Sequence, residues 1–153
     1  MTVKELAHLA ADVERRTEQL YRDMIPVFRS DGAMVGFLTE LAVQEAQHAR
    51  FVETALQHAS HPDRETGVSH DLFTLFFDTI DDVADEVIER GVDTRGALEI
   101  IIHLERSVAE EFYGAMAKHV PGLPNDFAVS MRESCITHMH TIENFRAHCL
   151  AAL

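Results

Sequence analysis

The chain has 153 residues, of which 46% are apolar, and it contains only seven glycines and four prolines. This size and composition predict one folded domain spanning residues 1–153 and argue against a disordered chain. The chain has 13 basic and 26 acidic side chains, which gives a formal net charge of −13. Because this charge repels phosphate backbones and anionic membrane surfaces, we expect no nucleic-acid or membrane partner.

The sequence carries no signal for a membrane or for export. No apolar run reaches the roughly 20 residues that span a bilayer, and the first 20 residues are amphipathic and charged rather than a signal peptide. We therefore expect a cytoplasmic protein. Cys135 and Cys149 lie 14 positions apart in one predicted helix, which separates them by about 21 Å and predicts two free thiols.

Apolar residues recur three and four positions apart along most of the chain, so we predict an all-α fold. The expected helices cover residues 3–28, 33–58, 72–90, 95–119 and 126–152. A tight turn at residues 30–32 makes the first two helices antiparallel neighbours, and a polar segment with Pro62 and Gly67 precedes the third. Four long helices and one short helix predict a four-helix bundle with the short helix in the long crossover between bundle helices two and three.

The short crossover helix has an apolar stripe that includes Phe73 and Phe76, with an acidic face opposite that we interpret as solvated. Gly91 is expected to end this helix, and Asp93 or Thr94 to cap the next one.

Polar residues interrupt the inward stripes of the four long helices. Glu14 follows Ala10 and precedes Thr17 and Tyr21 on the inward track of the first helix, so it occupies a core position. In the third long helix, Glu105 is the only charge in its stripe. A carboxylate that faces a core is costly unless hydrogen bonds or a metal ion compensate it.

The second and fourth long helices add histidines to this pattern. Glu45 and His48 form a Glu-x-x-His pair, whose spacing places both side chains on one face about one turn apart. On the fourth long helix His138 lies on the inward track, whereas His140 points about 160° away, so His138 is the better candidate.

Each of these residues also has a purely structural interpretation. Alone, Glu14 is a partly exposed acid, and His48 or His138 is a hydrogen-bonded core histidine. The coincidence of three such glutamates and two such histidines, distributed over the four long helices, favours a metal site over four separate accidents. Carboxylate and imidazole donors suit Fe or Mn and are poor ligands for copper(I).

These segments resemble the ferritin-like superfamily, and most closely its rubrerythrin-like branch, over nearly the whole chain. The resemblance rests on the Glu14 to Tyr21 spacing, on LAVQEAQHARF around Glu45 and His48, and on GALEIIIHLERSVAEEFY around Glu105. It implies two irons between the four helices, with Glu14 as a terminal ligand, Glu45 and Glu105 as bridging or semi-bridging ligands, and His48 as a nitrogen ligand.

The fourth long helix departs from the family pattern, because Cys135 stands where a second Glu-x-x-His would place its glutamate. Three explanations stay open: the second metal has fewer protein ligands plus water, the Cys135 thiolate participates, or the second site has lapsed. The chain also lacks the C-x-x-C pairs of a rubredoxin module, so electrons would come from a separate donor protein.

The resemblance implies a non-haem di-iron protein, a rubrerythrin-like peroxidase or oxidoreductase, whose reduced centre reacts with hydrogen peroxide or dioxygen. Tyr21 is the candidate catalytic side chain, because it is placed to hydrogen-bond a ligand carboxylate. The alternatives are metal-ion sequestration and a structural bundle with a partly lapsed site. A homodimer is expected, either through Phe73, Phe76 and Phe77 or with these rings packed inside the chain.

Overall fold

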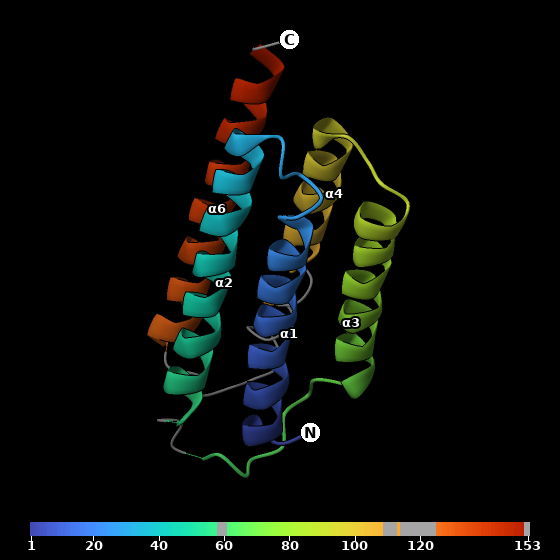
Figure 1. The fold of residues 1–153 in the computed structure, drawn as a ribbon. Coiled ribbons are helices and arrows are strands. Elements are labelled where there is room, and N and C mark those ends of the chain that lie inside the picture. Colours follow the sequence, from blue (N-terminus) through green and yellow to red (C-terminus); the bar gives the residue numbers. More distant parts are fainter. Residues whose placement is uncertain (58–60, 109–112, 114–124, 152–153) are drawn as a thin grey trace.

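The chain is all-helical in the computed structural model, which describes residues 1–57, 61–108, 113 and 125–151 (Figure 1). The described helices are α1 (Val3–Met24), α2 (Gly32–Gln57), α3 (His70–Ala84), α4 (Thr94–Ser107) and α6 (Asn125–Ala151), and a π-helical turn, Asp85–Glu89, continues α3. These residues include no strand, only an isolated bridge between Thr2 and Glu65. The predicted all-α class is confirmed. No described helix is long and apolar enough to cross a membrane.

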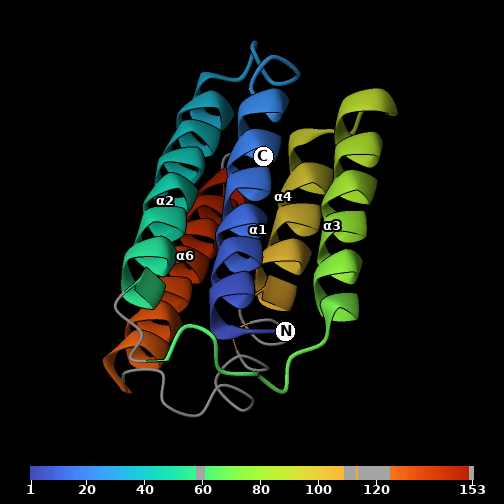
Figure 2. The same cartoon turned by 90° about the horizontal axis from the view of Figure 1, so that it is seen from below.

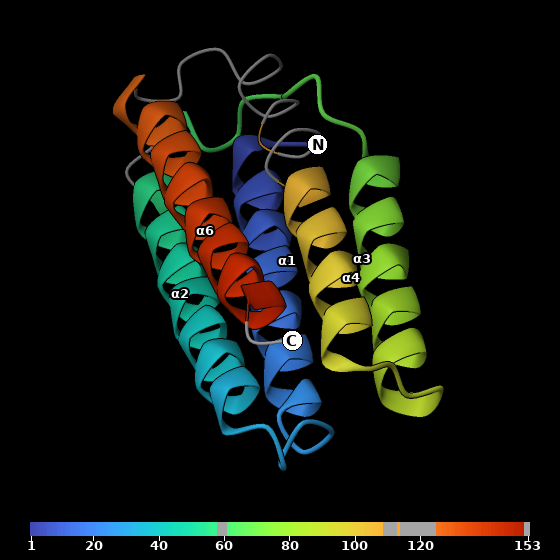
Figure 3. The ribbon, with the colours of Figure 1, turned by 90° about the horizontal axis from the view of Figure 1, so that it is seen from above.

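The helices lie side by side in a bundle-like arrangement (Figure 2). Helix α1 packs against α2 on one side and against α3 on the other, while α4 packs against α6, and α6 also contacts α2. Helices α1 and α2 run in opposite directions, as do α4 and α6 (Figure 3). Side chains from α1, α2, α4 and α6 can therefore meet in the interior, with α3 on the outer side.

Helix α1 begins with a capping box. The Thr2 hydroxyl accepts a hydrogen bond from the backbone N–H of Glu5 (3.2 Å), and the Glu5 carboxylate accepts one from the backbone N–H of Thr2 (2.8 Å). The carbonyl of Arg64 accepts from the N–H of Val3 (2.9 Å). The cap and this contact satisfy donors that the first turn leaves open, and they attach the segment before α3 to the start of α1.

Helix α1 ends at Met24, so the predicted end at residue 28 is wrong. Pro26 has no N–H to continue the helical hydrogen bonds, and the chain proceeds through turns. Asp31 then organises the start of α2, because its carboxylate accepts from the N–H of Met34 (3.0 Å). The second oxygen of Asp31 accepts from the Thr94 hydroxyl (3.1 Å), which ties this turn to the start of α4.

The connection from α3 to α4 follows the predicted signals. Ser69 caps α3 by accepting from the N–H of Asp71, so this helix begins two residues before the predicted position. Gly91 has a φ of 73°, a left-handed conformation that glycine adopts without strain, and the helical segment ends before it. Asp93 is the residue that caps α4, by accepting from the N–H of Gly96 (2.8 Å).

The phenylalanines of α3 pack inside the chain. Phe73 and Phe76 are each only 2% exposed, so of the two alternatives for these rings the structure agrees with packing inside the chain. Phe77 is half-buried beneath the guanidinium of Arg16, which lies 4.2 Å from the ring centroid.

The described part of α4 is shorter than its prediction of residues 95–119, and most of the remainder lies outside the described residues. The side chains of Phe112, Met116, Phe127 and Met131 also lie outside the described residues. Helix α6 agrees with its prediction to within one residue at each end, and Cys135 and Cys149 are both free thiols, as predicted.

Candidate metal centre

Three glutamates from three helices are buried in the interior. Glu14 of α1 and Glu45 of α2 are each 2% exposed, and Glu105 of α4 is 7% exposed. Their neighbours on each inward stripe, such as Leu41 and Ile101, are fully buried, so the helical register carries the carboxylates into the core. Buried carboxylates need partners that compensate the loss of water.

The imidazole of His48 faces two of these carboxylates. Its Nδ1 atom lies 3.3 Å from Oε2 of Glu45 and 3.5 Å from Oε2 of Glu14. The side chain of His48 is 12% exposed, so one edge of the ring still reaches the outside. Helices α1 and α2 thus contribute two carboxylates and one imidazole to a common point.

The imidazole of His138 on α6 mirrors this arrangement. Its Nδ1 atom lies 3.0 Å from Oε1 of Glu45 and 3.5 Å from Oε2 of Glu105. His138 is 3% exposed, whereas His140 is exposed, in keeping with the predicted orientation of the two rings. Glu45 consequently stands in the middle of the cluster, with one oxygen facing each imidazole.

Two tyrosines bind Glu14 and Glu105, which lie on either side of Glu45 and are called the outer carboxylates below. The Tyr21 hydroxyl donates to Oε1 of Glu105, and the Tyr113 hydroxyl donates to Oε1 of Glu14. Tyr21 contacts Glu105 rather than Glu14, its neighbour on the same stripe of α1. Sequence reasoning missed Tyr113, although its position eight residues after Glu105, near the same helical face, was an available signal.

The environment of the cluster separates the proton affinities of its carboxyl groups. Burial, together with the charges of Glu105 and Glu14, raises the pKa of Glu45 well above its ordinary value. Burial also raises the pKa of Glu105, to about 7. Burial opposes ionisation of Glu14, but hydrogen bonds with Glu45 and His48 outweigh it and lower the pKa of Glu14. Without a cation, Glu14 carries the negative charge and Glu45 keeps a proton.

The two histidines are shifted in opposite directions. Burial works against the charged form of His48, but the hydrogen bond and charge of Glu14 outweigh it and raise its pKa. Burial, with the charge of His48 as the next cause, lowers the pKa of His138 to about 4. At neutral pH, His138 therefore offers a neutral imidazole with a free lone pair.

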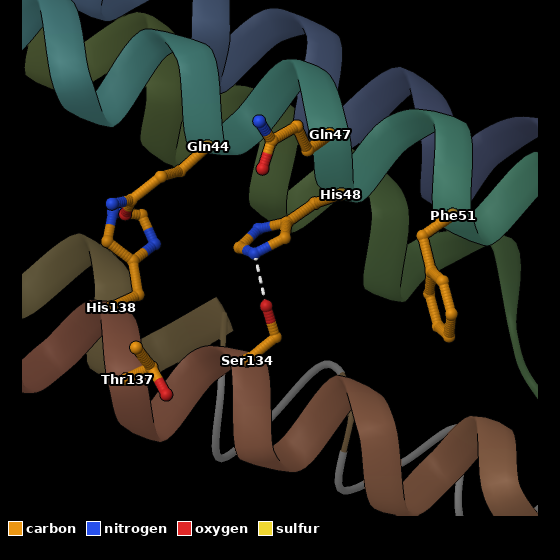
Figure 4. A pocket seen from close by; sticks show the side chains of 7 residues that line it. All are labelled: Gln44, Gln47, His48, Phe51, Ser134, Thr137 and His138. Atoms are coloured by element: carbon orange, nitrogen blue, oxygen red, sulfur yellow. Dashed lines mark hydrogen bonds between the residues drawn. The ribbon is translucent and has the colours of Figure 1, made fainter.

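A pocket opens between α2 and α6 beside the two imidazoles (Figure 4). Apart from the histidines and Phe51, the described lining consists of the uncharged polar side chains Gln44, Gln47, Ser134 and Thr137. The hydroxyl of Ser134 contacts Nε2 of His48 at 2.5 Å. Sequence reasoning also missed Ser134, although it precedes His138 by four residues and so shares its helix face.

Cys135 lies beside the cluster, partly buried, at the predicted inward position on α6. Burial, followed by the charges of Glu14 and Glu105, raises the pKa of its thiol to about 12. The nearest acidic residues on α6, Glu133 and Glu143, are exposed. The described part of α6 therefore places no carboxylate in the cluster, and Cys135 carries a proton at neutral pH unless a cation displaces it.

The donor atoms of Glu45, His48 and His138 all lie within 4.8 Å of one another, which makes these three residues a candidate metal-binding group. Two buried atoms of the group, Oε1 of Glu45 and Nε2 of His138, form no hydrogen bond among the described residues. Nδ1 of His138 approaches that glutamate oxygen to 3.0 Å without forming a hydrogen bond to it. Buried carboxylate and imidazole groups that lack some of their hydrogen-bond partners fit a divalent first-row metal ion, which such groups can bind as ligands.

Comparison with known proteins gives no match: no family model, no curated protein and no solved structure is significantly similar to the chain.

Proposed function

We propose that the protein is a ferritin-like, rubrerythrin-like non-haem iron protein in which α1, α2, α4 and α6 form the four-helix bundle and α3 lies in the long crossover. One observation carries the proposal: three buried glutamates and two histidines from these four helices converge on one interior point. Helix bundles of this kind bind metal pairs with Glu and Glu-x-x-His ligands that project inward.

The candidate ligands form two sets that share Glu45. Glu14, Glu45 and His48 would hold one ion, and Glu45, Glu105 and His138 would hold the second. Tyr113 and Tyr21 orient the two outer carboxylates through their hydroxyl groups. Such hydrogen bonds to ligand carboxylates hold their orientation and tune their basicity.

The proposed activity is reduction of hydrogen peroxide or dioxygen. A bound pair of ferrous ions would supply the two electrons that, with two protons, convert hydrogen peroxide to water. The pocket beside His48 and His138 is the proposed entrance, because its described lining has no carboxylate and no Lys or Arg side chain and therefore admits a small uncharged polar molecule. Manganese is the alternative metal.

The proposal includes a separate electron-donor protein, a cytoplasmic location and a homodimer. It also includes Tyr21 as the candidate catalytic side chain, because its hydroxyl donates a hydrogen bond to the candidate ligand Glu105. Reduced protein should then be oxidised once by peroxide and stop unless a donor is added.

A second candidate function is metal-ion binding without turnover, and Cys135 favours it. The position that would supply a fourth carboxylate carries a thiol whose pKa is raised to about 12. Two divalent ions would face only three carboxylates, so the second ion lacks one compensating negative charge. A bundle that holds a single ion, or has lost its metal, is the corresponding outcome.

Anaerobic reconstitution separates these functions. The purified protein is loaded with ferrous iron, its metal content per chain is measured, and the absorbance is followed after one equivalent of peroxide is added. Close to two irons per chain and a rapid absorbance change support the proposed enzyme. About one iron per chain without a peroxide reaction supports sequestration, and a metal content near zero contradicts both.

The variant His140→Ala serves as the matched control, because this exposed imidazole lies on the same helix as His138 but outside the cluster. Its iron content should equal that of the wild type. An equal loss of iron in His140→Ala and in His138→Ala would show adventitious surface binding.

A further inference from the structure

We infer that Ser134 is a positioning residue for His48: its hydroxyl holds Nε2 of the imidazole so that Nδ1 stays directed at the carboxylates. This inference rests on the proposed metal-binding function. Ser134 belongs to α6 and His48 to α2, 86 positions apart in the chain, and their 2.5 Å contact crosses the pocket between the two helices (Figure 4).

The contact fixes the ring from its outer side. Nδ1 of His48 faces Glu45 at 3.3 Å and Glu14 at 3.5 Å, so Nε2, on the opposite side of the ring, points away from the carboxylates and toward Ser134. A ring held at one nitrogen only could rotate about its bond to Cβ. Contacts at both nitrogens leave one orientation.

A hydroxyl suits this position for a chemical reason. When Nδ1 binds a cation, the proton of a neutral imidazole resides on Nε2, and the Ser134 oxygen can accept a hydrogen bond from this N–H group. When no cation is present and Nδ1 donates to a glutamate, the same hydroxyl can rotate and donate to Nε2. Ser134 therefore supports the same ring orientation before and after metal binding, so the ring need not reorganise when the ion arrives.

The second histidine provides an internal comparison. Nε2 of His138 is buried and has no hydrogen-bond partner among the described residues. Of the two imidazoles in the cluster, His48 is therefore the one whose Nε2 atom has a side-chain partner among the described residues. Histidine ligands of metals usually donate their second N–H to a carboxylate, carbonyl or water, and removal of such a partner typically costs 10- to 100-fold in metal affinity.

Helix α6 also supplies a matched control. Thr137 lines the same pocket, but its hydroxyl donates to the carbonyl of Glu133 within its own helix (2.9 Å). Thr137→Ala thus removes a pocket hydroxyl without touching an imidazole. Ser134→Ala removes the contact to His48, and Ser134→Thr keeps a hydroxyl at that position.

The first measurement uses metal-free protein with 15N-labelled histidine. Wild type, Ser134→Thr and Thr137→Ala should each give a single set of His48 ring resonances in NMR spectra. Ser134→Ala should give broadened or doubled His48 resonances, since one end of the ring is released. Unchanged His48 resonances in Ser134→Ala would overturn the inference, and this result does not depend on whether the protein binds metal.

The second measurement is a Co(II) titration followed by visible absorption. Ser134→Ala should bind Co(II) about 10- to 100-fold more weakly than wild type, with an altered spectrum. Ser134→Thr and Thr137→Ala should remain close to wild type. Equal affinities for Ser134→Ala and Thr137→Ala would overturn the role of Ser134. If the wild type itself binds no Co(II), the proposed metal-binding function fails, while the NMR result still decides how His48 is positioned.

Discussion

The α1–α2 half of the cluster contributes Glu14, Glu45 and His48, whereas the α4–α6 half contributes Glu105 and His138. Each half has one outer carboxylate held by a tyrosine and one imidazole whose Nδ1 faces Glu45. The halves differ three residues before the histidine, where α2 carries Glu45 and α6 carries Cys135.

The two halves also differ in their electrostatics. The pKa of His48 is raised because the carboxylate of Glu14 outweighs its burial, while burial lowers the pKa of His138 to about 4. Glu105, the outer carboxylate beside His138, has a pKa raised to about 7 by burial. The α4–α6 half is therefore close to neutral without metal, and a cation there gains less from the protein's charge.

The largest expected effect comes from Glu45, which both halves share. Glu45→Gln keeps the shape of the side chain but removes the anionic donor that faces both imidazoles. Metal affinity should fall by more than about 100-fold, since even the loss of an outer hydrogen-bond partner costs 10- to 100-fold. Metal analysis after anaerobic reconstitution measures the change.

The fold should tolerate this substitution, because the raised pKa of Glu45 keeps it protonated without metal and glutamine is neutral as well. Thermal unfolding of the metal-free variant checks that expectation. A variant that folds like the wild type and still binds a full complement of metal would rule out a shared central ligand.

The substitution Cys135→Glu would make the two halves equivalent. It recreates a Glu-x-x-His pair with His138 and adds an anionic donor over the same turn of α6. If wild type holds one ion per chain, the variant should approach two, at a packing cost of about 1–3 kcal/mol because the new side chain is larger. Metal stoichiometry and chemical unfolding measure both effects. If the wild type already holds two ions and Cys135→Ala leaves that number unchanged, Cys135 is only a core residue.

The substitution His138→Ala affects one half of the centre alone. It should lower metal occupancy while leaving the contacts of His48 with Glu14 and Glu45 in place. His140→Ala should change occupancy little, because this ring is exposed. Elemental analysis of the two variants side by side distinguishes an inward ligand from a histidine on the surface; equal occupancy in both would place His138 outside the metal site.

The smallest expected effect is a pH dependence that originates at Glu105. Its pKa of about 7 means that the carboxyl keeps its proton below pH 7 without metal, and this proton must leave before the oxygen binds a cation. Apparent affinity for Co(II) should therefore fall by about tenfold between pH 8 and pH 6 through this group. His138 stays neutral in this range because its pKa is about 4. Titrations at several pH values test the sign, and an affinity that rises toward pH 6 would contradict it.

The sequence alone was sufficient to place the candidate ligands. Helical periodicity put Glu14, Glu45 and Glu105 on inward stripes and separated His138 from His140, and the burial of these side chains agrees with those positions. Capping signals located the junction at Gly91 and Asp93. These features depend on interactions within about one helical turn, so they can be derived from residue spacing.

Only the tertiary structure decided which atoms meet. Tyr113 reaches Glu14 across 99 positions of the chain, and Ser134 reaches His48 across 86. The apolar stripe of one helix indicates that a side chain points inward. Which residue that side chain contacts depends on how the neighbouring helices pack and on their relative rotation. For the same reason Phe73 was an open alternative in the sequence, since an apolar face can cover the core of its own chain or that of another copy, and packing of α3 against α1 placed it inside.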